Sequence, residues 1–303
     1  MRIVFMGTPN FAVPILEALN TNYEIVGVVS QPSRAKKRGV IIDTPVAEYA
    51  KNNNLLLFQP EKISTIIEKL KDLNAEVLVT AAYGQYLPSK LLNLFKFKIN
   101  VHGSLLPKHR GGAPIQRAIL NGDIKTGVTI MEMAKKLDAG KIYSMREYDI
   151  LPTDNSTILF NKLSIIGRDL LLETIEDIYS GKNQGIAQDE TLASYSPNLL
   201  PEEEKIDIHS KTKDIINRIH AFSMDIGSYL EIGSVKLKIY EAHEVKSNDE
   251  PCGMVLSTKK EIVIKTLDSA ISLDLVQLPG KKIMSGRDFS NGQKLLINGQ
   301  IIG

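Results

Sequence analysis

The chain has 303 residues, and its formal net charge of +2 does not by itself indicate a nucleic-acid binder. This length exceeds the common size of one domain, so we expect two. A single cysteine, Cys252, excludes an internal disulfide framework, the first residues lack a signal-peptide pattern, and no apolar run approaches membrane-spanning length. We therefore expect a cytoplasmic monomer with no membrane partner.

The first half of the chain alternates between strand and helix patterns. Apolar or β-branched runs predict strands over residues 2–6, 23–29, 77–82, 97–102, 128–133 and 141–150. Apolar residues at helical spacing predict helices over 11–19, 61–73 and 154–179. A parallel sheet covered by helices on both faces is the simplest architecture with this order. The fold class expected for this half is α/β, a Rossmann-like doubly wound sheet.

The pattern changes after residue 181, where Gly, Asn, Gln, Ser, Pro and Glu accumulate up to residue 205. A short helix is predicted next, over 212–222. It is followed by short strand candidates at 228–232, 235–240, 253–256, 261–265 and 270–277. Evenly spaced short strands are typical of a small β-barrel, here OB-like. We expect a first domain over 1–189, a linker over 190–205 and a C-terminal barrel domain over 206–303.

Polar residues, Asn100 and His102 among them, alternate with Phe97, Ile99 and Val101 in the run that ends at Gly103. Strand side chains alternate between faces, so Asn100 and His102 point the same way. In doubly wound sheets, ligands bind beyond the carboxyl ends of strands, where this pair lies. If the loop carrying Asp138 lies beside it, that carboxylate can orient the His102 ring, and His102 with the Asn100 amide can stabilise an oxyanion.

Structural interpretations of the same residues remain open at this point. A histidine on a strand can serve packing, Asn100 can satisfy backbone groups at a strand end, and the Asp-Ala-Gly around Asp138 is a common turn. The glycine after the first strand, Gly7, does not begin a G-x-G-x-x-G pattern, and no P-loop occurs, so we expect no dinucleotide cofactor. Ser104 has no evident second base, which favours direct transfer between bound substrates.

Five sequence blocks resemble the folate-dependent formyltransferases. They are MGTPNFAVP over residues 6–14, NVHGSLLP over 100–107, RGGAPIQ over 110–116, LDAG over 137–140 and LPGKKIM over 278–284. The last of these resembles the second domain of the members that act on methionyl-tRNA. The likeness thus covers almost the whole chain.

The resemblance implies transfer of the formyl group of 10-formyltetrahydrofolate to the α-amino group of methionyl initiator tRNA, without a metal. It assigns catalysis to Asn100, His102 and Asp138. The loop it implies for folate binding consists of Ser104, Leu105, Leu106 and Pro107. The basic loop it implies for the acceptor arm of the tRNA carries Arg34, Lys36, Lys37 and Arg38. The C-terminal domain is implied to bind tRNA as well.

The chain departs from the family pattern at His109, Arg117 and Lys136, where an aromatic residue, tryptophan and glycine are usual. These departures leave substrate contacts near them open. Two other functions compete with the main one. The same catalytic block serves formylation of amino-sugar nucleotides, and a degenerate formyltransferase fold could bind RNA without catalysis.

Overall fold

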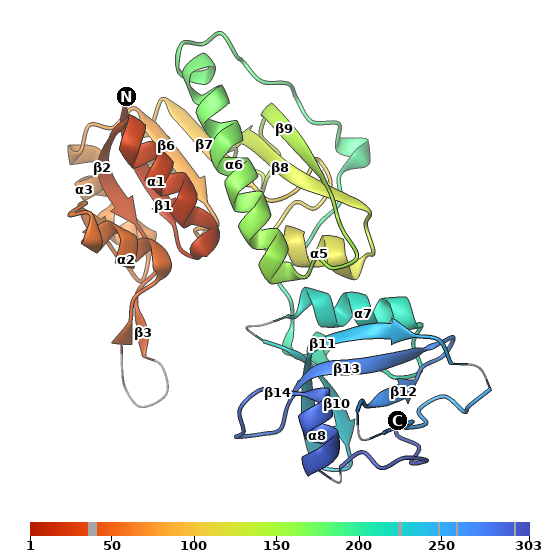
Figure 1. Cartoon of the computed structure of the whole chain (residues 1–303). Coiled ribbons are helices and arrows are strands. Elements are labelled where there is room, and N and C mark those ends of the chain that lie inside the picture. Colours follow the sequence, from red (N-terminus) through yellow and green to blue (C-terminus); the bar gives the residue numbers. More distant parts are fainter. Residues whose placement is uncertain (36–40, 224–225, 248, 259, 294) are drawn as a thin grey trace. The chain divides into compact units, whose positions relative to one another are not determined.

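The computed structural model describes residues 1–35, 41–223, 226–247, 249–258, 260–293 and 295–303 (Figure 1). The chain forms two compact units, each described by itself. Unit 1 consists of Met1–Pro114, Lys125–Asp149 and Phe160–Pro197, and unit 2 of Ile115–Ile124, Ile150–Leu159 and Asn198–Gly303. The sharp domain boundaries expected from the sequence remain a prediction. None of the described helices has both the length and the apolar content needed to cross a bilayer.

Unit 1 is built on a seven-stranded sheet with the order β5-β2-β1-β6-β7-β8-β9. Its strands are β1 (Arg2–Gly7), β2 (Glu24–Val29), β5 (Leu57–Phe58), β6 (Val77–Ala81), β7 (Phe97–His102), β8 (Lys125–Glu132) and β9 (Ile142–Asp149). The order reverses between β1 and β6. The carboxyl ends of β1, β6 and β7 therefore lie side by side at the switch point, where such sheets bind ligands.

The sheet is mixed, which corrects the all-parallel arrangement suggested by the alternating pattern. Strands β5, β2, β1, β6 and β7 pair in parallel, whereas β8 is antiparallel to both of its neighbours, β7 and β9. The chain passes from β8 to β9 without an intervening helix. Such a direct connection joins antiparallel strands, because parallel neighbours need a long crossover.

Helices cover both faces of this sheet. They are α1 (Val13–Asn22), α2 (Pro45–Asn52), α3 (Ile67–Asp72), α4 (Ser89–Leu92) and α6 (Ser156–Tyr179), with short 3₁₀ turns η1 (Asn10–Ala12) and η2 (Ile63–Ile66). On one face Val4 and Met6 of β1 share an apolar cluster with Leu70 of α3. On the other face α6 approaches so closely that a Cβ added at Gly167 would lie 2.8 Å from Val101 of β7. The long amphipathic helix expected over 154–179 is thereby confirmed as a cover of the sheet.

Unit 2 contains a curled antiparallel sheet with the order β10-β11-β13-β12, in which β14 also pairs with β13. Its elements include most of α5 (Pro114–Leu120), then α7 (Thr212–Ala221), β10 (Ser228–Ile232), β11 (Val235–Val245), β12 (Val263–Lys265), β13 (Ala270–Gln277), β14 (Met284–Ser285) and α8 (Gly286–Gly292). Ile219 of α7 and Phe289 of α8 fill the same apolar core as Ile239 and Ile271 of the sheet. This half-barrel confirms the predicted OB-like class.

Unit 2 differs from the sequence-based expectation at two places. The strand expected over 253–256 is not among the strands of the described residues, although this segment makes the isolated bridges Met254–Ile301 and Val255–Ile264. Helix α8 was not predicted, because it follows β14 directly and spans only seven residues. Its first turn is secured by the Ser285 hydroxyl, which accepts a hydrogen bond from the Asp288 amide at 3.0 Å.

The segment interpreted as a surface linker is anchored for much of its length. It contains the short turns η3 (Glu190–Leu192) and η4 (Pro201–Glu204). Between them, the Arg110 amide donates to the Ser194 carbonyl at 2.9 Å, and the Ser196 amide donates to the Arg110 carbonyl at 2.6 Å. The part of this segment in unit 1 therefore packs against the loop that follows β7.

Candidate functional site

Asn100 lies on β7 beside Thr80 of β6, its parallel register partner. The Thr80 hydroxyl donates a hydrogen bond of 2.7 Å to the Asn100 Oδ1 atom. This contact fixes which way the amide points, so Nδ2 becomes the donor that faces the site. Within the described residues this nitrogen has no hydrogen-bond partner. A donor held in this way can stabilise negative charge that develops on a bound carbonyl group.

His102, the last residue of β7, is almost fully buried. Its Nε2 atom lies 2.9 Å from the His109 carbonyl oxygen, which can only accept, so Nε2 carries a proton. The other ring nitrogen, Nδ1, lies 3.8 Å from Asp138 Oδ2. The nitrogen that can gain or lose a proton is therefore the one that faces Asp138, and a charged His102 would form an ion pair there.

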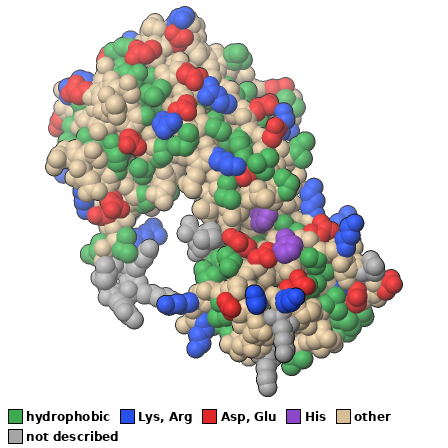
Figure 2. Space-filling view, viewed as in Figure 1, with side chains coloured by type: hydrophobic (Ala, Val, Ile, Leu, Met, Phe, Trp, Pro, Cys, Tyr) green, Lys and Arg blue, Asp and Glu red, His purple; other side chains and the backbone are tan. Residues whose placement is uncertain are grey.

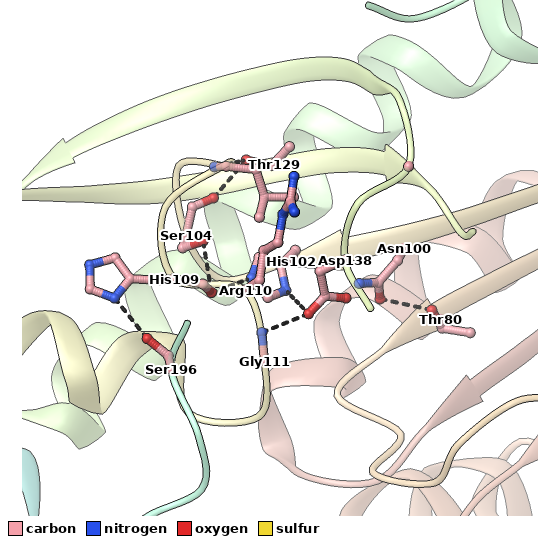
Figure 3. A network of polar contacts seen from close by, with 12 residues as sticks. Thr80, Asn100, His102, Ser104, His109, Arg110, Gly111, Thr129, Asp138 and Ser196 are labelled. Carbon is pink, nitrogen blue, oxygen red and sulfur yellow. Dashed lines mark hydrogen bonds and ion pairs between the residues drawn. The ribbon is translucent and has the colours of Figure 1, made fainter. Parts of the chain in front are cut away.

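Asp138 extends from the loop between β8 and β9, and its carboxylate lies between the ring of His102 and the amide of Asn100 (Figure 3). The Gly111 amide donates to the same Oδ2 atom at 2.8 Å. The structure thus brings together Asn100, His102 and Asp138, which are 38 positions apart at most. Their roles in catalysis remain a proposal.

The loop predicted to bind folate turns two of its four side chains inward. Ser104 is fully buried and donates to the Lys108 carbonyl at 2.8 Å, and Leu106 is buried as well. Leu105 and Pro107 are half-buried. The Thr129 hydroxyl donates to the Ser104 carbonyl at 2.6 Å, which ties the loop to β8.

Arg110, which carried no assigned role in the sequence, has the largest fully buried side chain among the described residues. Its guanidinium donates to Gln188 and to Glu190, with the shortest contacts at 2.7 and 2.8 Å. Lys136 also contacts Glu190, at 2.5 Å. Hydrogen bonds from Arg110 and then from Lys136 lower the pKa of Glu190 to about 2. In the sequence, Arg110 stood out only as part of the RGG motif, and no motif pointed to Gln188 or Glu190.

The cluster around Arg110 makes stability depend on pH. Because the folded-state pKa of Glu190 is depressed from 4.5 to about 2, its carboxylate stabilises the fold above pH 4.5, and this contribution disappears as the pH falls toward 2. We therefore expect Glu190→Gln to lower the melting temperature at pH 7, and the difference from wild type to shrink between pH 4.5 and pH 2. Thermal unfolding across this range measures it, with the exposed Glu202→Gln as control. A difference that stays constant with pH would contradict the assignment.

The basic loop can be described only in part. Arg34 is exposed on the short strand β3 (Arg34–Ala35), which pairs with β4 (Ile41–Ile42). Lys36, Lys37 and Arg38 lie outside the described residues. Arg34 also lines a cavity of about 340 Å³ at the carboxyl ends of β2 and β6. The other lining residues are Gln31, Pro32, Ser33, Glu61, Gly84, Gln85 and Tyr86. This polar cavity at the switch point was not predicted.

Charges of both signs alternate over the part of the surface shown in colour in Figure 2, without a broad patch of one sign. Among the described residues, no three His, Cys, Asp or Glu side chains are grouped so that they could hold a metal ion. The groups available for chemistry at the end of β7 are an amide, an imidazole and a carboxylate. Such a set suits hydrogen bonding and proton movement.

The three departures from the family pattern have distinct surroundings. His109 is buried, and its Nδ1 atom lies 2.8 Å from the Ser196 hydroxyl. Arg117, in unit 2, forms a two-pronged contact with Glu203 at 2.6 and 2.8 Å. Lys136 pairs with Glu190. Each of these three side chains therefore contacts a polar side chain of its own unit.

Comparisons with known proteins agree with the motifs. The formyl transferase family matches residues 1–175, and the formyl transferase C-terminal domain matches residues 198–294. A methionyl-tRNA formyltransferase of Streptococcus pyogenes serotype M2 (strain MGAS10270) is 45% identical over 310 residues, which span 100% of this chain and 99% of that protein.

Two solved structures share the fold at lower identity. HypX from Aquifex aeolicus, in complex with tetrahydrofolic acid, has a TM-score of 0.70 and 17% identity, covering 97% of this chain and 48% of HypX. An N-formyltransferase from Helicobacter canadensis, in complex with folinic acid and dTDP-3-aminofucose, has a TM-score of 0.69 and 20% identity, covering 89% of this chain and 98% of that one. At these identities the likeness shows the fold alone. The full-length identity to the streptococcal protein confirms the resemblance seen in the motifs: the chain belongs to the formyl transferase family, among its methionyl-tRNA formyltransferases.

Proposed function

We propose that this protein transfers the formyl group of 10-formyltetrahydrofolate to the α-amino group of methionyl initiator tRNA, with Asn100, His102 and Asp138 as catalytic residues. The observation that carries the assignment of residues is the convergence of these three side chains at the carboxyl end of β7. We also propose that the protein is a monomer and acts in the cytoplasm, where aminoacylated tRNA is used.

The reaction makes few demands on a base. An α-amino group titrates near pH 8, so a substantial fraction is already a neutral nucleophile. Transfer forms a bond between this nitrogen and the formyl carbon, breaks the bond to the folate nitrogen, and moves one proton from the first nitrogen to the second. The protein must therefore align the reactants, stabilise charge on the formyl oxygen and carry that proton.

The three residues divide these tasks by their geometry. Asn100 Nδ2, oriented by Thr80, donates to the formyl oxygen as negative charge develops there. His102 Nε2 is occupied by the His109 carbonyl, so Nδ1 is the ring position that can donate or accept a proton. Asp138, held by Gly111, orients and balances a protonated ring and helps the proton leave the amine. This refines the role expected for His102, because only Nδ1 is available.

The folate co-substrate supplies the formyl group, and the surroundings of the site fit it. The loop from Ser104 to Pro107 begins directly after Gly103 and keeps Leu105 and Pro107 half-buried for apolar contact. The polar cavity lined by Arg34 opens at the carboxyl ends of β2 and β6, the strands on either side of β1. We propose that Ser104 and Leu106 shape the loop while Leu105 and Pro107 border the co-substrate.

Acceptor choice is tested by comparing amines directly. Purified protein and 10-formyltetrahydrofolate are incubated with methionyl initiator tRNA, methionyl elongator tRNA and an amino-sugar nucleotide in parallel. We expect formyl transfer to the initiator species at the highest rate. Equal or faster formylation of the nucleotide sugar would replace the proposed acceptor, and tRNA binding without any transfer would favour the non-catalytic hypothesis.

The basic loop is expected to make tRNA binding depend on salt. Each phosphate contact contributes a slope of about −0.9 when log affinity is plotted against log salt, or about −0.7 for single strands. Replacing Arg34, Lys36, Lys37 and Arg38 with glutamine should therefore weaken binding and flatten the slope by roughly one for each phosphate that is no longer neutralised. Filter binding at several salt concentrations measures this, with the exposed Lys69→Gln of α3 as control. An unchanged slope in the fourfold variant would exclude the loop from the tRNA contact.

A further inference from the structure

Gln188 links the site loop to the loop that carries Asp138. Its Oε1 atom accepts hydrogen bonds from Arg110 Nε at 3.1 Å and from Nη2 at 2.7 Å. Its Nε2 atom donates to the carbonyl oxygens of Asp138 at 2.8 Å and Gly140 at 2.7 Å. A side-chain amide has two donor hydrogens and two acceptor lone pairs, so every one is used. The amide cannot be flipped without placing its oxygen against two carbonyl oxygens.

The turn that Gln188 holds is unfavourable by itself. Asp138 has a φ of +47°, a left-handed backbone conformation that residues other than glycine rarely adopt. Two residues later, Gly140 lies so close to β8 that an added Cβ would be 1.9 Å from the Glu132 carbonyl oxygen. Backbone in such a conformation persists only where its surroundings hold it. The two bonds from Gln188 Nε2 supply part of that restraint at the two ends of the turn.

Gln188 also restrains the second element that fixes the carboxylate. Arg110 is fully buried, and its guanidinium is held by Gln188 together with Glu190. The next residue, Gly111, is the one whose amide donates to Asp138 Oδ2. The side-chain amide of Gln188 thus contacts the main chain of Asp138. It also contacts the side chain of Arg110, the residue next to Gly111.

We infer that Gln188 is a positioning residue, which sets the place of the Asp138 carboxylate relative to His102 through the turn at 138–140 and through Arg110. The inference deepens the proposed function and rests on it, because it matters for turnover only if Asp138 acts in the transfer. Gln188 itself touches no reacting group. It lies two positions before the linker predicted over 190–205.

Two substitutions separate the two halves of the contact. Gln188→Met keeps the length of the side chain and removes all four hydrogen bonds, whereas Gln188→Glu keeps an acceptor for Arg110 but turns an oxygen toward the carbonyls of Asp138 and Gly140. Because small displacements of a catalytic group can cost about 10²-fold in rate, we expect both variants to lower kcat by that order. KM for both substrates should stay within about twofold, since the loss is confined to the transition state.

The matched control is Gln184→Met, the same change four positions earlier at an exposed glutamine whose side chain has no hydrogen bond within the described part of the chain. This variant should keep the wild-type kcat. Wild-type kcat in both Gln188 variants would overturn the inference. Loss in Gln188→Met with full activity in Gln188→Glu would also overturn it, because the contact with Arg110 alone would then suffice.

A double-mutant cycle distinguishes positioning of Asp138 from general support of the fold. In an Asp138→Ala background, measured by single turnover at high enzyme concentration, Gln188→Met should cost less than about threefold, because residues that act as one unit are not additive. An undiminished loss of about 10²-fold in this background would mean that Gln188 acts through something else.

A readout independent of turnover keeps this test separate from the test of function. Amide hydrogen exchange at Gly111 reports the bond to Asp138 Oδ2. We expect Gln188→Met to speed exchange there by about tenfold without a comparable change in the strands of the sheet. Faster exchange combined with wild-type turnover in Asp138→Ala would defeat the catalytic role proposed for Asp138 and leave the structural link intact. Unchanged exchange would defeat the link.

Discussion

Replacing His102 with alanine is expected to lower the rate of formyl transfer by about 10²- to 10⁴-fold, the range contributed by a positioned proton-transfer group. The reason is that the two ring nitrogens of His102 have different partners. Nε2 is held by the His109 carbonyl, so only Nδ1, 3.8 Å from Asp138, can take part in proton movement. Single-turnover transfer to methionyl-tRNA measures the rate. Affinity for the tRNA, measured by filter binding, should change by less than about twofold because the missing interaction is specific to the transition state.

A second substitution at the same position guards against a purely structural explanation. His102→Gln can still donate a hydrogen bond to the His109 carbonyl but has no group that titrates. We expect it to be as slow as His102→Ala, whereas His243→Ala, at an exposed histidine of β11, should transfer at the normal rate. A fast His102→Gln variant would show that His102 serves only to hold the loop after β7.

Asn100→Asp is expected to lower kcat by about 10²- to 10³-fold, the usual cost of one donor to a developing oxyanion. The change is nearly isosteric, and the remaining oxygen can still accept from Thr80, so the sheet should be undisturbed. The variant lacks the Nδ2 donor and carries a new negative charge near Asp138. KM for methionyl-tRNA should be nearly unchanged, since the donor acts mainly in the transition state.

Thr80→Val provides the graded comparison for Asn100. It removes the hydroxyl that orients the amide but leaves the amide in place, so we expect a smaller loss of about three- to tenfold. Steady-state kinetics on both variants, with melting temperatures to confirm folding, decide the order. Wild-type kcat in Asn100→Asp would remove the amide nitrogen from the proposed mechanism, whatever the result at Thr80.

Elements with a strong local pattern were predicted well. Local periodicity was enough to predict β1, β2, β6 and the buried stripe of α6. Apolar runs and helical spacing are properties of a few consecutive residues. Pairing direction is not such a property. The antiparallel position of β8 depends on where the chain returns after α5, and periodicity predicted a parallel sheet there.

In the site, too, features set by neighbouring residues were predictable, whereas contacts between distant segments were not. Asn100 and His102 were placed on one face by strand alternation alone. Asp138 could be suspected from its motif, but its distance from His102 depends on the β8–β9 loop folding back across the end of the sheet. Gln188 and Glu190 belong to no motif and lie at the predicted boundary between the first domain and the linker.

The sequence by itself determined the family, the two-part organisation and the strand that carries Asn100 and His102, because these depend on short motifs and on local periodicity. Only the tertiary structure decided which nitrogen of His102 faces Asp138, which hydroxyl orients Asn100 and which side chain holds the turn at 138–140. Each of these contacts joins residues from separate elements. Their geometry follows from how the sheet, its loops and the segment before Pro197 pack together, and no stretch of sequence encodes that packing alone.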